Sequence, residues 1–143
     1  MGRILGIDFG ERRMGLAISD ELKITAQGIN VWETRNQDED LLFLKSIIKN
    51  YGVDKIVIGI PLDKYGKSTQ SSSVSEFINI LRKNLNLPIE TWDERFTTLE
   101  AERMLIQADV KRKKRRQVID KISAQIILQS YLDYNANIKN HNE

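Results

Sequence analysis

The chain has 143 residues, 41% of them hydrophobic and 29% charged, a length that suits one domain with its own core and is too short for two. It contains no cysteine and a single histidine, His141, in a polar end, which excludes disulfides, Ser-His and Cys-His catalysis and histidine-rich zinc sites. The formal net charge is +2, and we expect a cytoplasmic protein that does not associate with membranes, because no secretion signal or membrane-spanning run is present.

The first part of the sequence predicts three strands and a helix. The expected strands are residues 3–9, 14–20 and 24–32, the first two forming a hairpin. Gly28 weakens the third of them. Apolar residues at helical spacing, after an acidic start, then predict a helix that Gly52 ends.

The second part alternates helices and strands. Residues 54–60 follow the helix and are apolar from Ile56 onward, which indicates a buried strand joined by a parallel crossover. Further elements are expected as a helix opened by Ser73, a strand at 89–92, a helix opened by Thr97 and a last helix from about 113 to 134. The pattern predicts one domain over residues 1–134, built on a mixed sheet flanked by helices, and a flexible polar tail at 135–143.

Asp8 is the one acidic residue of the first predicted strand. An ionised carboxylate inside a packed sheet costs several kcal/mol unless a partner or a metal neutralises it. A strand-end aspartate often caps a following helix, but here a second strand follows. Gly6 and Gly10 flank Asp8 and are expected to let a ligand approach the backbone closely.

Two further acidic sites lie in apolar surroundings. Asp120 shares a face of the last helix with Ala124 and Ile127, so it leads an apolar stripe. A salt bridge with a neighbouring arginine is the alternative explanation. Asp93 and Glu94 follow a strand and precede a helix, where ligand-binding groups collect in open α/β sheets. Strand alternation sends these two to opposite faces, and the residues alone do not decide which one joins the cluster.

Basic residues are concentrated near the start of the last helix. Residues 111–143 contain 8 Lys or Arg and 3 Asp or Glu. Most of this surplus is one unbroken run, formed by Lys111, Arg112, Lys113, Lys114, Arg115 and Arg116. A solvated helix start is the alternative, but a basic run near carboxylates favours phosphate binding. Arg12 and Arg13, in the hairpin connection, are further candidates for phosphate contacts.

Four segments together resemble the YqgF/RuvX family. They are GIDFGERRMGLAISD from Gly6, GIPL from Gly59, WDERFTT from Trp92 and VIDKISAQIILQSYL from Val118. The likeness runs from about Arg3 to Asp133 in one order, so it is specific. It implies a ribonuclease H-like fold, with a five-stranded mixed sheet and helices on both faces, as in Holliday-junction resolvases.

The resemblance also implies a function. Members of the family are implicated in trimming the 5′ end of the precursor of 16S rRNA, so RNA, within a pre-ribosomal particle or free, is the implied partner. The acidic residues of the family map onto Asp8, the Asp93–Glu94 pair and Asp120, with Glu94 favoured as the middle ligand. We expect Asp8, Glu94 and Asp120 to hold two Mg²⁺ or Mn²⁺ ions, because hard oxygen ligands favour these ions.

Three other functions remain open. A sugar-kinase or actin-like ATPase also begins with a glycine-flanked aspartate, but it clamps nucleotide between two such domains. A non-catalytic nucleic-acid adaptor would have no need of the carboxylates. A true Holliday-junction resolvase acting on branched DNA would require a homodimer, and the sequence does not distinguish a dimer from a monomer.

Overall fold

Five strands form one mixed sheet in the order β3-β2-β1-β4-β5. They are β1 (Arg3–Phe9), β2 (Arg13–Ser19), β3 (Ala26–Glu33), β4 (Val53–Ile60) and β5 (Ile89–Asp93). The structure is a computed structural model that describes residues 2–10, 12–60, 72–93 and 112–141, without the side chains of residues 72, 93, 112–120 and 137–141. The predicted helix at 97–105 lies outside these residues.

The strand directions confirm the predicted mixed sheet. β2 runs antiparallel to both β1 and β3, as expected for two successive hairpins. β4 pairs in parallel with β1, and β5 pairs in parallel with β4. The parallel β1–β4 pair requires a crossover, and helix α1 (Gln37–Tyr51) supplies it.

Local signals set both ends of α1. The side chain of Asn36 accepts a hydrogen bond from the backbone N–H of Glu39 at 2.8 Å, which caps the helix start. Gly52 closes the helix in the left-handed conformation, with φ of 66°, which glycine adopts without a steric penalty. The prediction that Gly52 ends this helix is therefore confirmed.

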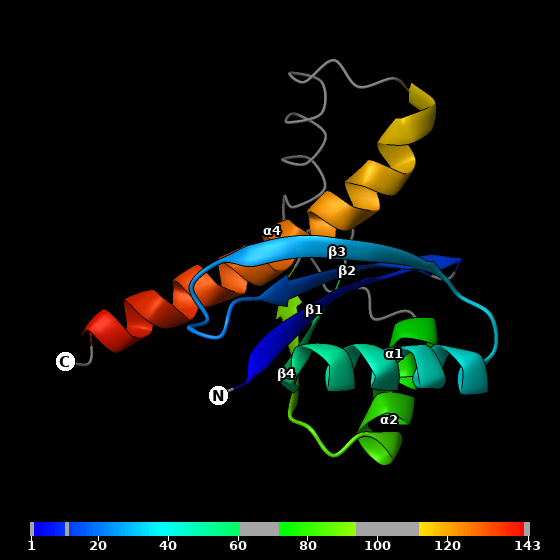
Figure 1. Cartoon of the computed structure of the whole chain (residues 1–143), viewed down its shortest axis with the longest axis horizontal. Coiled ribbons are helices and arrows are strands. Elements are labelled where there is room, and N and C mark those ends of the chain that lie inside the picture. The colour runs from blue at the N-terminus through cyan, green and yellow to red at the C-terminus, as the bar shows by residue number, and fades with distance from the viewer. Residues whose placement is uncertain (1, 11, 61–71, 94–111, 142–143) are drawn as a thin grey trace.

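The helices cover both faces of the sheet (Figure 1). α1 and α2 (Ser72–Asn84) pack on the face formed by alternate strand residues such as Leu5 and Ile7. The other face, which includes Ile4 and Val57, packs against α4 (Arg112–His141). Because strand side chains alternate between faces, these two apolar sets are separate cores divided by the sheet.

Two helix boundaries differ from those predicted. α2 begins at Ser72, so Ser73 lies within its first turn instead of preceding it. α4 continues past Tyr134 to His141 and so includes most of the predicted polar tail. The predicted end at Tyr134 is wrong because no glycine or proline follows to end the helix. Among the helices in the described part of the chain, none has the length and apolar character of a membrane span.

Candidate active site

Asp8 lies near the end of β1, the central strand of the sheet, on the face that α4 covers. Its neighbours Leu5 and Ile7 belong to the core on the α1–α2 face. Gly6, two residues before Asp8, lies against α4, because a Cβ added to Gly6 would be 2.9 Å from the Cβ of Leu128. Alternation along the strand then places Asp8 on the same face as Gly6.

The residues beside Asp8 on the neighbouring strands are both glycines. Asp8 is in register with Gly15 of β2 and with Gly59 of β4. Gly15 is in turn in register with Val31, and Gly59 with Trp92. One row across the sheet therefore reads Val31, Gly15, Asp8, Gly59, Trp92. The partly buried aspartate therefore has a residue without a side chain beside it on each neighbouring strand, an arrangement typical of sites where a ligand approaches the backbone closely.

The structure changes the roles expected of Gly6 and Gly10. Gly6 is not exposed to a ligand, because Leu128 of α4 covers it. A Cβ at Gly10 would lie 2.7 Å from the carbonyl oxygen of Arg13, so Gly10 is needed to close the hairpin. The glycines that flank Asp8 in space, Gly15 and Gly59, are distant in sequence from each other and could be recognised only from the strand register.

α4 crosses the sheet over the row of residues that contains Gly6, two residues before Asp8 along β1. Lys121 lies on Gly28 of β3, and Ala124 and Leu128 lie on Gly6 of β1. Further along α4, Tyr131 reaches Glu90 of β5 with a hydrogen bond of 2.8 Å. The helix therefore runs from the β3 edge to the β5 edge, and the row that contains Asp8 lies beside it, toward the C-terminal end of β1.

The other predicted site residues are described to different extents. Arg12 is exposed and Arg13 partly buried, and both line a cavity of about 350 Å³ with Glu33 and Thr34. Positions 112–116 form the first turns of α4, and Asp120 lies in the same helix, with only the backbone described. Asp93 is the last residue of β5, in register with Ile60. Glu94 and Lys111 lie outside the described residues.

No group of three acidic or histidine side chains is close enough to hold a metal among the side chains that the structure describes. Of the predicted metal ligands, only Asp8 has a described side chain. The cluster of Asp8, Glu94 and Asp120 therefore stays a prediction, supported by the register of β1 and the position of α4.

A polar network that sequence analysis missed joins α4 to strands β4 and β5. The Lys55 ammonium donates to the Tyr131 hydroxyl at 2.6 Å and lies 2.8 Å from a Glu90 carboxylate oxygen. The Tyr131 ring also meets Trp92 edge-on, with centroids 5.5 Å apart. The signal in the sequence was the presence of the charged residues Lys55 and Glu90 in two predicted strands that also carry buried apolar residues.

The network shifts the pKa values of both charged partners. The hydrogen bond from Lys55 lowers the pKa of Glu90 below its ordinary 4.5, although partial burial opposes this. Burial lowers the pKa of Lys55, but the hydrogen bonds with Glu90 and Tyr131 outweigh it and the pKa is raised. Both shifts favour the charged pair at neutral pH.

The Glu90 pair should make a pH-dependent contribution to stability. Because the folded-state pKa of Glu90 is depressed, the pair stabilises the fold above the ordinary pKa of 4.5 and the contribution is lost as the pH falls through the folded value. We expect Glu90→Gln to lower stability at pH 7 by about 0.5 kcal/mol, since the carboxylate is half exposed. Thermal unfolding at about pH 7 and pH 3 measures this. Glu76→Gln is the charge-matched control, and an equal loss at both pH values would contradict the role of the pair.

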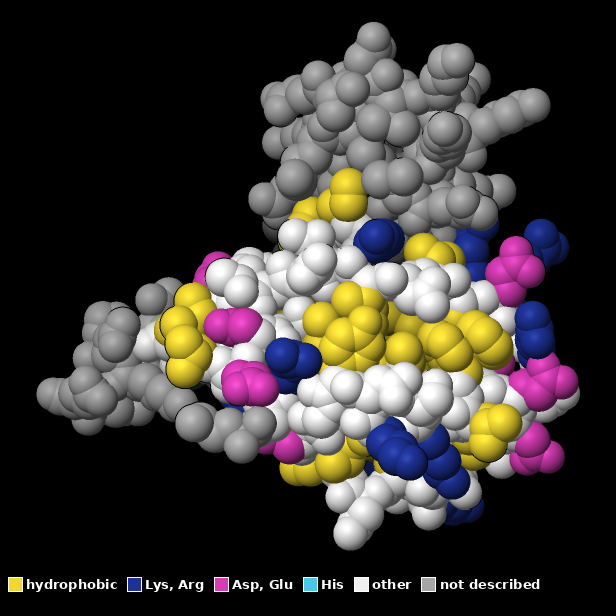
Figure 2. Space-filling model, viewed as in Figure 1, with side chains coloured by type: hydrophobic (Ala, Val, Ile, Leu, Met, Phe, Trp, Pro, Cys, Tyr) yellow, Lys and Arg dark blue, Asp and Glu magenta, His cyan; other side chains and the backbone are white. Residues whose placement is uncertain are grey.

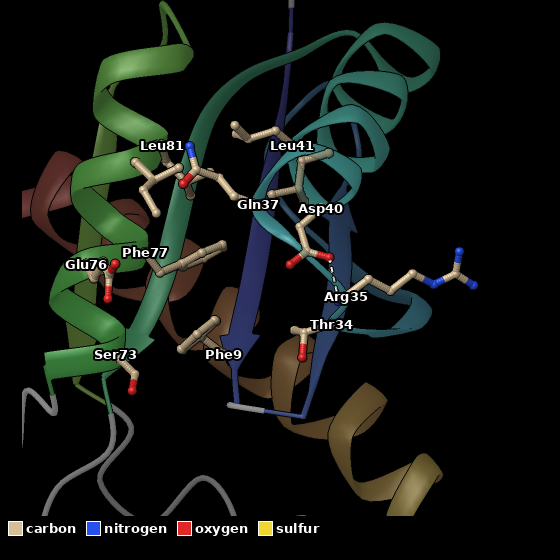
Figure 3. Close-up of a pocket in the computed structure, with 12 residues that line it drawn as sticks. Phe9, Thr34, Arg35, Gln37, Asp40, Leu41, Ser73, Glu76, Phe77 and Leu81 are labelled. Carbon is tan, nitrogen blue, oxygen red and sulfur yellow. Dashed lines mark hydrogen bonds between the residues drawn. The ribbon is translucent and has the colours of Figure 1, made fainter.

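A second cavity lies on the opposite face of the sheet, between α1 and α2 (Figure 3). It has a volume of about 430 Å³. Phe9 and Phe77 stack at its base with ring centroids 4.4 Å apart, and Gln37 and Asp40 contribute polar groups. Because Phe9 and Asp8 are consecutive strand residues, they face opposite sides of the sheet, and this cavity is separate from the candidate active site.

Comparison with known proteins identifies the family. The family model described as "RuvX: Holliday junction resolvase" matches residues 2–134. The chain belongs to the RuvX family. A relative from Halothermothrix orenii is 49% identical over 133 residues, which cover 92% of this chain and 95% of the relative. Another from Geobacillus kaustophilus is 51% identical over 134 residues, covering 92% and 97%. Both are named "Putative pre-16S rRNA nuclease".

Solved structures support the fold of this RuvX member. RuvC of T. thermophilus, in complex with a Holliday junction substrate, superposes with a TM-score of 0.58 at 10% identity, over 96% of this chain and 97% of RuvC. The fowlpox virus Holliday junction resolvase gives 0.57 at 17% identity, over 92% and 99%. The predicted ribonuclease H-like fold is confirmed. The predicted enzyme class, a hydrolase of phosphodiester bonds, agrees with the names of the family and of its members.

Proposed function

We propose that this protein is a metal-dependent nuclease that hydrolyses phosphodiester bonds in the 5′-end maturation of precursor 16S rRNA. The observation that carries the proposal is the placement of Asp8 on the central strand, between Gly15 and Gly59 and beside α4. A carboxylate at the end of the central strand, with no side chain on the residue beside it in either neighbouring strand, can face a metal ion and a phosphate together.

The orientation of α4 supports Asp120 as a second ligand. Gln129 accepts a hydrogen bond from the backbone N–H of Ala26, at the start of β3, at 2.9 Å. Position 120 is nine residues earlier, which at 100° per residue is two and a half turns. It is therefore on the opposite side of the helix axis from Gln129. β3 runs in the same direction as β1 because both are antiparallel to β2. Position 120 is therefore on the side of α4 toward the end of β1, where Asp8 lies.

Strand alternation within β5 argues against Asp93 as the third ligand. Glu90 and Trp92 both contact Tyr131, so alternate residues of β5 face α4. Trp92 is also in the same row as Asp8. Asp93, the last residue of β5, occupies the alternate position. We therefore keep Glu94, the residue that the family resemblance favours, as the proposed middle ligand.

The proposed ligands are all carboxylates, a donor set that suits Mg²⁺ or Mn²⁺. When bound, such ions would lower the pKa of a water that attacks phosphorus and neutralise the leaving oxygen. Asp8 sits on the rigid central strand and α4 is held by the Lys55–Tyr131–Glu90 network. In this proposal, the two elements would hold Asp8 and Asp120 in position, so little reorganisation of these two residues would accompany metal and substrate binding.

The substrate assignment follows the named relatives at 49% and 51% identity. Arg12, Arg13 and the basic run at 111–116 are proposed to bind the phosphate backbone, which fixes the RNA in position without reading its sequence. A four-way DNA junction is the second candidate substrate, because the family model is described as a Holliday junction resolvase.

A cleavage assay with both substrates tests the proposal. The purified protein is incubated with a precursor 16S rRNA fragment that carries its 5′ extension, and separately with a four-way DNA junction, across a titration of Mg²⁺ and of Mn²⁺. We expect metal-dependent cleavage of the RNA and none in EDTA. Cleavage of the junction alone would favour the second candidate, and cleavage of neither substrate with either ion would refute the nuclease.

A further inference from the structure

A groove runs along β3, the edge strand of the sheet nearest the start of α4. Its volume is about 560 Å³, and β3 residues from Ile29 to Glu33 form its floor. Three basic side chains line it, and each comes from a different element: Arg13 from β2, Arg35 from the segment after β3, and Lys121 from α4. Figure 2 shows Lys and Arg side chains on this side of the molecule, where β3 ends near the base of α4.

Arg35 is held in place by its neighbours. Its guanidinium lies 5.0 Å from the ring centre of Trp32, and the Trp32 ring is itself stacked with Phe43, with centroids 4.0 Å apart. Asp40 fixes the backbone, because it accepts hydrogen bonds from the Arg35 N–H and from the Trp32 indole. The Nη1 atom of Arg35 donates to the Glu39 carboxylate at 3.4 Å in an exposed i,i+4 ion pair, and the remaining in-plane donors of the stacked guanidinium are directed toward solvent, where they can meet a phosphate. Figure 3 shows that Arg35 extends away from the cavity between α1 and α2.

Lys121 is fixed through its aliphatic stem. The Cγ of Lys121 would lie only 2.7 Å from a Cβ on Gly28, so the stem lies against the backbone of β3. The residue as a whole is exposed, which leaves its ammonium in solvent at the side of the groove. Gln125, one turn later, accepts a hydrogen bond from the Gly28 N–H at 3.3 Å and holds this part of α4 on β3.

The groove adjoins the candidate active site. Val31 lines the groove and belongs to the row that contains Asp8, with only Gly15 between them. Two strand spacings separate Asp8 from Val31, which is about 10 Å, or about three nucleotide steps of a stacked strand. Glu33 is the one acidic side chain among the groove residues, and Glu39 pairs with Arg35 from α1. The three basic groups therefore exceed the two carboxylates by one positive charge.

We propose that the groove along β3 binds the phosphate backbone of the nucleic-acid strand as it leaves the scissile phosphate, with Arg35 and Lys121 as contacts in addition to Arg13. The proposal rests on the nuclease function proposed above and extends the binding surface from the basic run across α4 to the edge of the sheet. The excess of positive charge favours a polyanion over a protein strand added to the β3 edge.

Binding measurements across a salt titration test the groove without any need for cleavage. RNA affinity is measured by fluorescence anisotropy in Asp8→Asn protein, with and without the added pair Arg35→Gln and Lys121→Gln. Loss of two phosphate contacts should lower the slope of log affinity against log salt by about 1.4, so the fall in affinity between 50 and 200 mM salt becomes about sevenfold smaller. The pair Lys45→Gln and Lys49→Gln, exposed on α1, removes the same charge and should leave the slope within experimental error.

Glu33→Gln gives an effect of the opposite sign. Removal of the acidic group opposite Arg13 in the strand register should tighten RNA binding about two- to threefold at low salt. A slope unchanged by the Arg35 and Lys121 pair, or reduced equally by the α1 pair, would overturn the proposal. If the groove variants behave as expected but the unmodified protein cleaves no substrate, the groove stands and the nuclease function fails.

Discussion

Asp8→Asn should abolish phosphodiester cleavage and leave RNA binding nearly unchanged. The amide keeps the shape of the side chain but lacks the negative charge that a divalent ion requires. Loss of one metal ligand removes several kcal/mol of transition-state stabilisation, and about 4 kcal/mol corresponds to roughly a thousandfold lower rate. Single-turnover cleavage of a precursor 16S rRNA fragment, with anisotropy for affinity, measures both quantities. Asp120→Asn should behave in the same way.

The control for this experiment is a matched change on the other face of the sheet. Asp38 lies exposed in the first turn of α1, so Asp38→Asn removes one carboxylate charge without touching the candidate site. Its cleavage rate should stay within about twofold of the unmodified protein. Calorimetric titration with Mn²⁺ adds a readout independent of activity, because the Asp8 variant should bind the ion more weakly. Full activity in either the Asp8 or the Asp120 variant would refute the carboxylate cluster.

Neutralisation of Lys113, Lys114, Arg115 and Arg116 together should produce the largest loss of RNA affinity. Each phosphate contact on a single strand contributes about 0.7 to the slope of log affinity against log salt. If all four side chains make such a contact, the slope falls by about 2.8 and the loss of affinity between 50 and 200 mM salt becomes about fiftyfold smaller. Anisotropy titrations at four or five salt concentrations give the slope directly.

The control for the fourfold variant removes two charges from α1, so the changes in slope of the two variants are compared per charge removed. Lys45→Gln and Lys49→Gln on α1 lower the net charge by two without altering the α4 side of the sheet. Their effect per charge should be small, because exposed charges separated by more than about 10 Å are largely screened at these salt concentrations. An unchanged slope in the fourfold variant would mean that the basic run is only a solvated helix start.

Local sequence signals were sufficient for most of the secondary structure. The alternating and apolar runs predicted the strands, and the acidic start and Gly52 predicted the extent of α1. The same signals failed at the end of α4, because a polar composition after Tyr134 does not end a helix unless glycine or proline is present. Helix ends without a stop residue are decided by weak preferences, which sequence patterns resolve poorly.

The candidate site also has parts that the sequence predicts and parts that only the structure shows. The sequence could single out Asp8 and Asp120 because a charged side chain among apolar residues requires a partner, and the family resemblance supplied their role. It could not show that Gly15 and Gly59 flank Asp8, since strand register joins residues from three separate segments. The network of Lys55, Glu90 and Tyr131 was hidden for the same reason.

By itself the sequence determined the order of the elements, the ribonuclease H-like family and the acidic residues that could hold metal ions. Only the tertiary structure decided that Asp8 lies on the α4 face and that Arg35 and Lys121 share a groove with Arg13. Periodicity and capping are properties of neighbours along the chain, whereas register and helix crossing depend on contacts between residues far apart in sequence. Those contacts form only when the two cores pack on either side of the sheet.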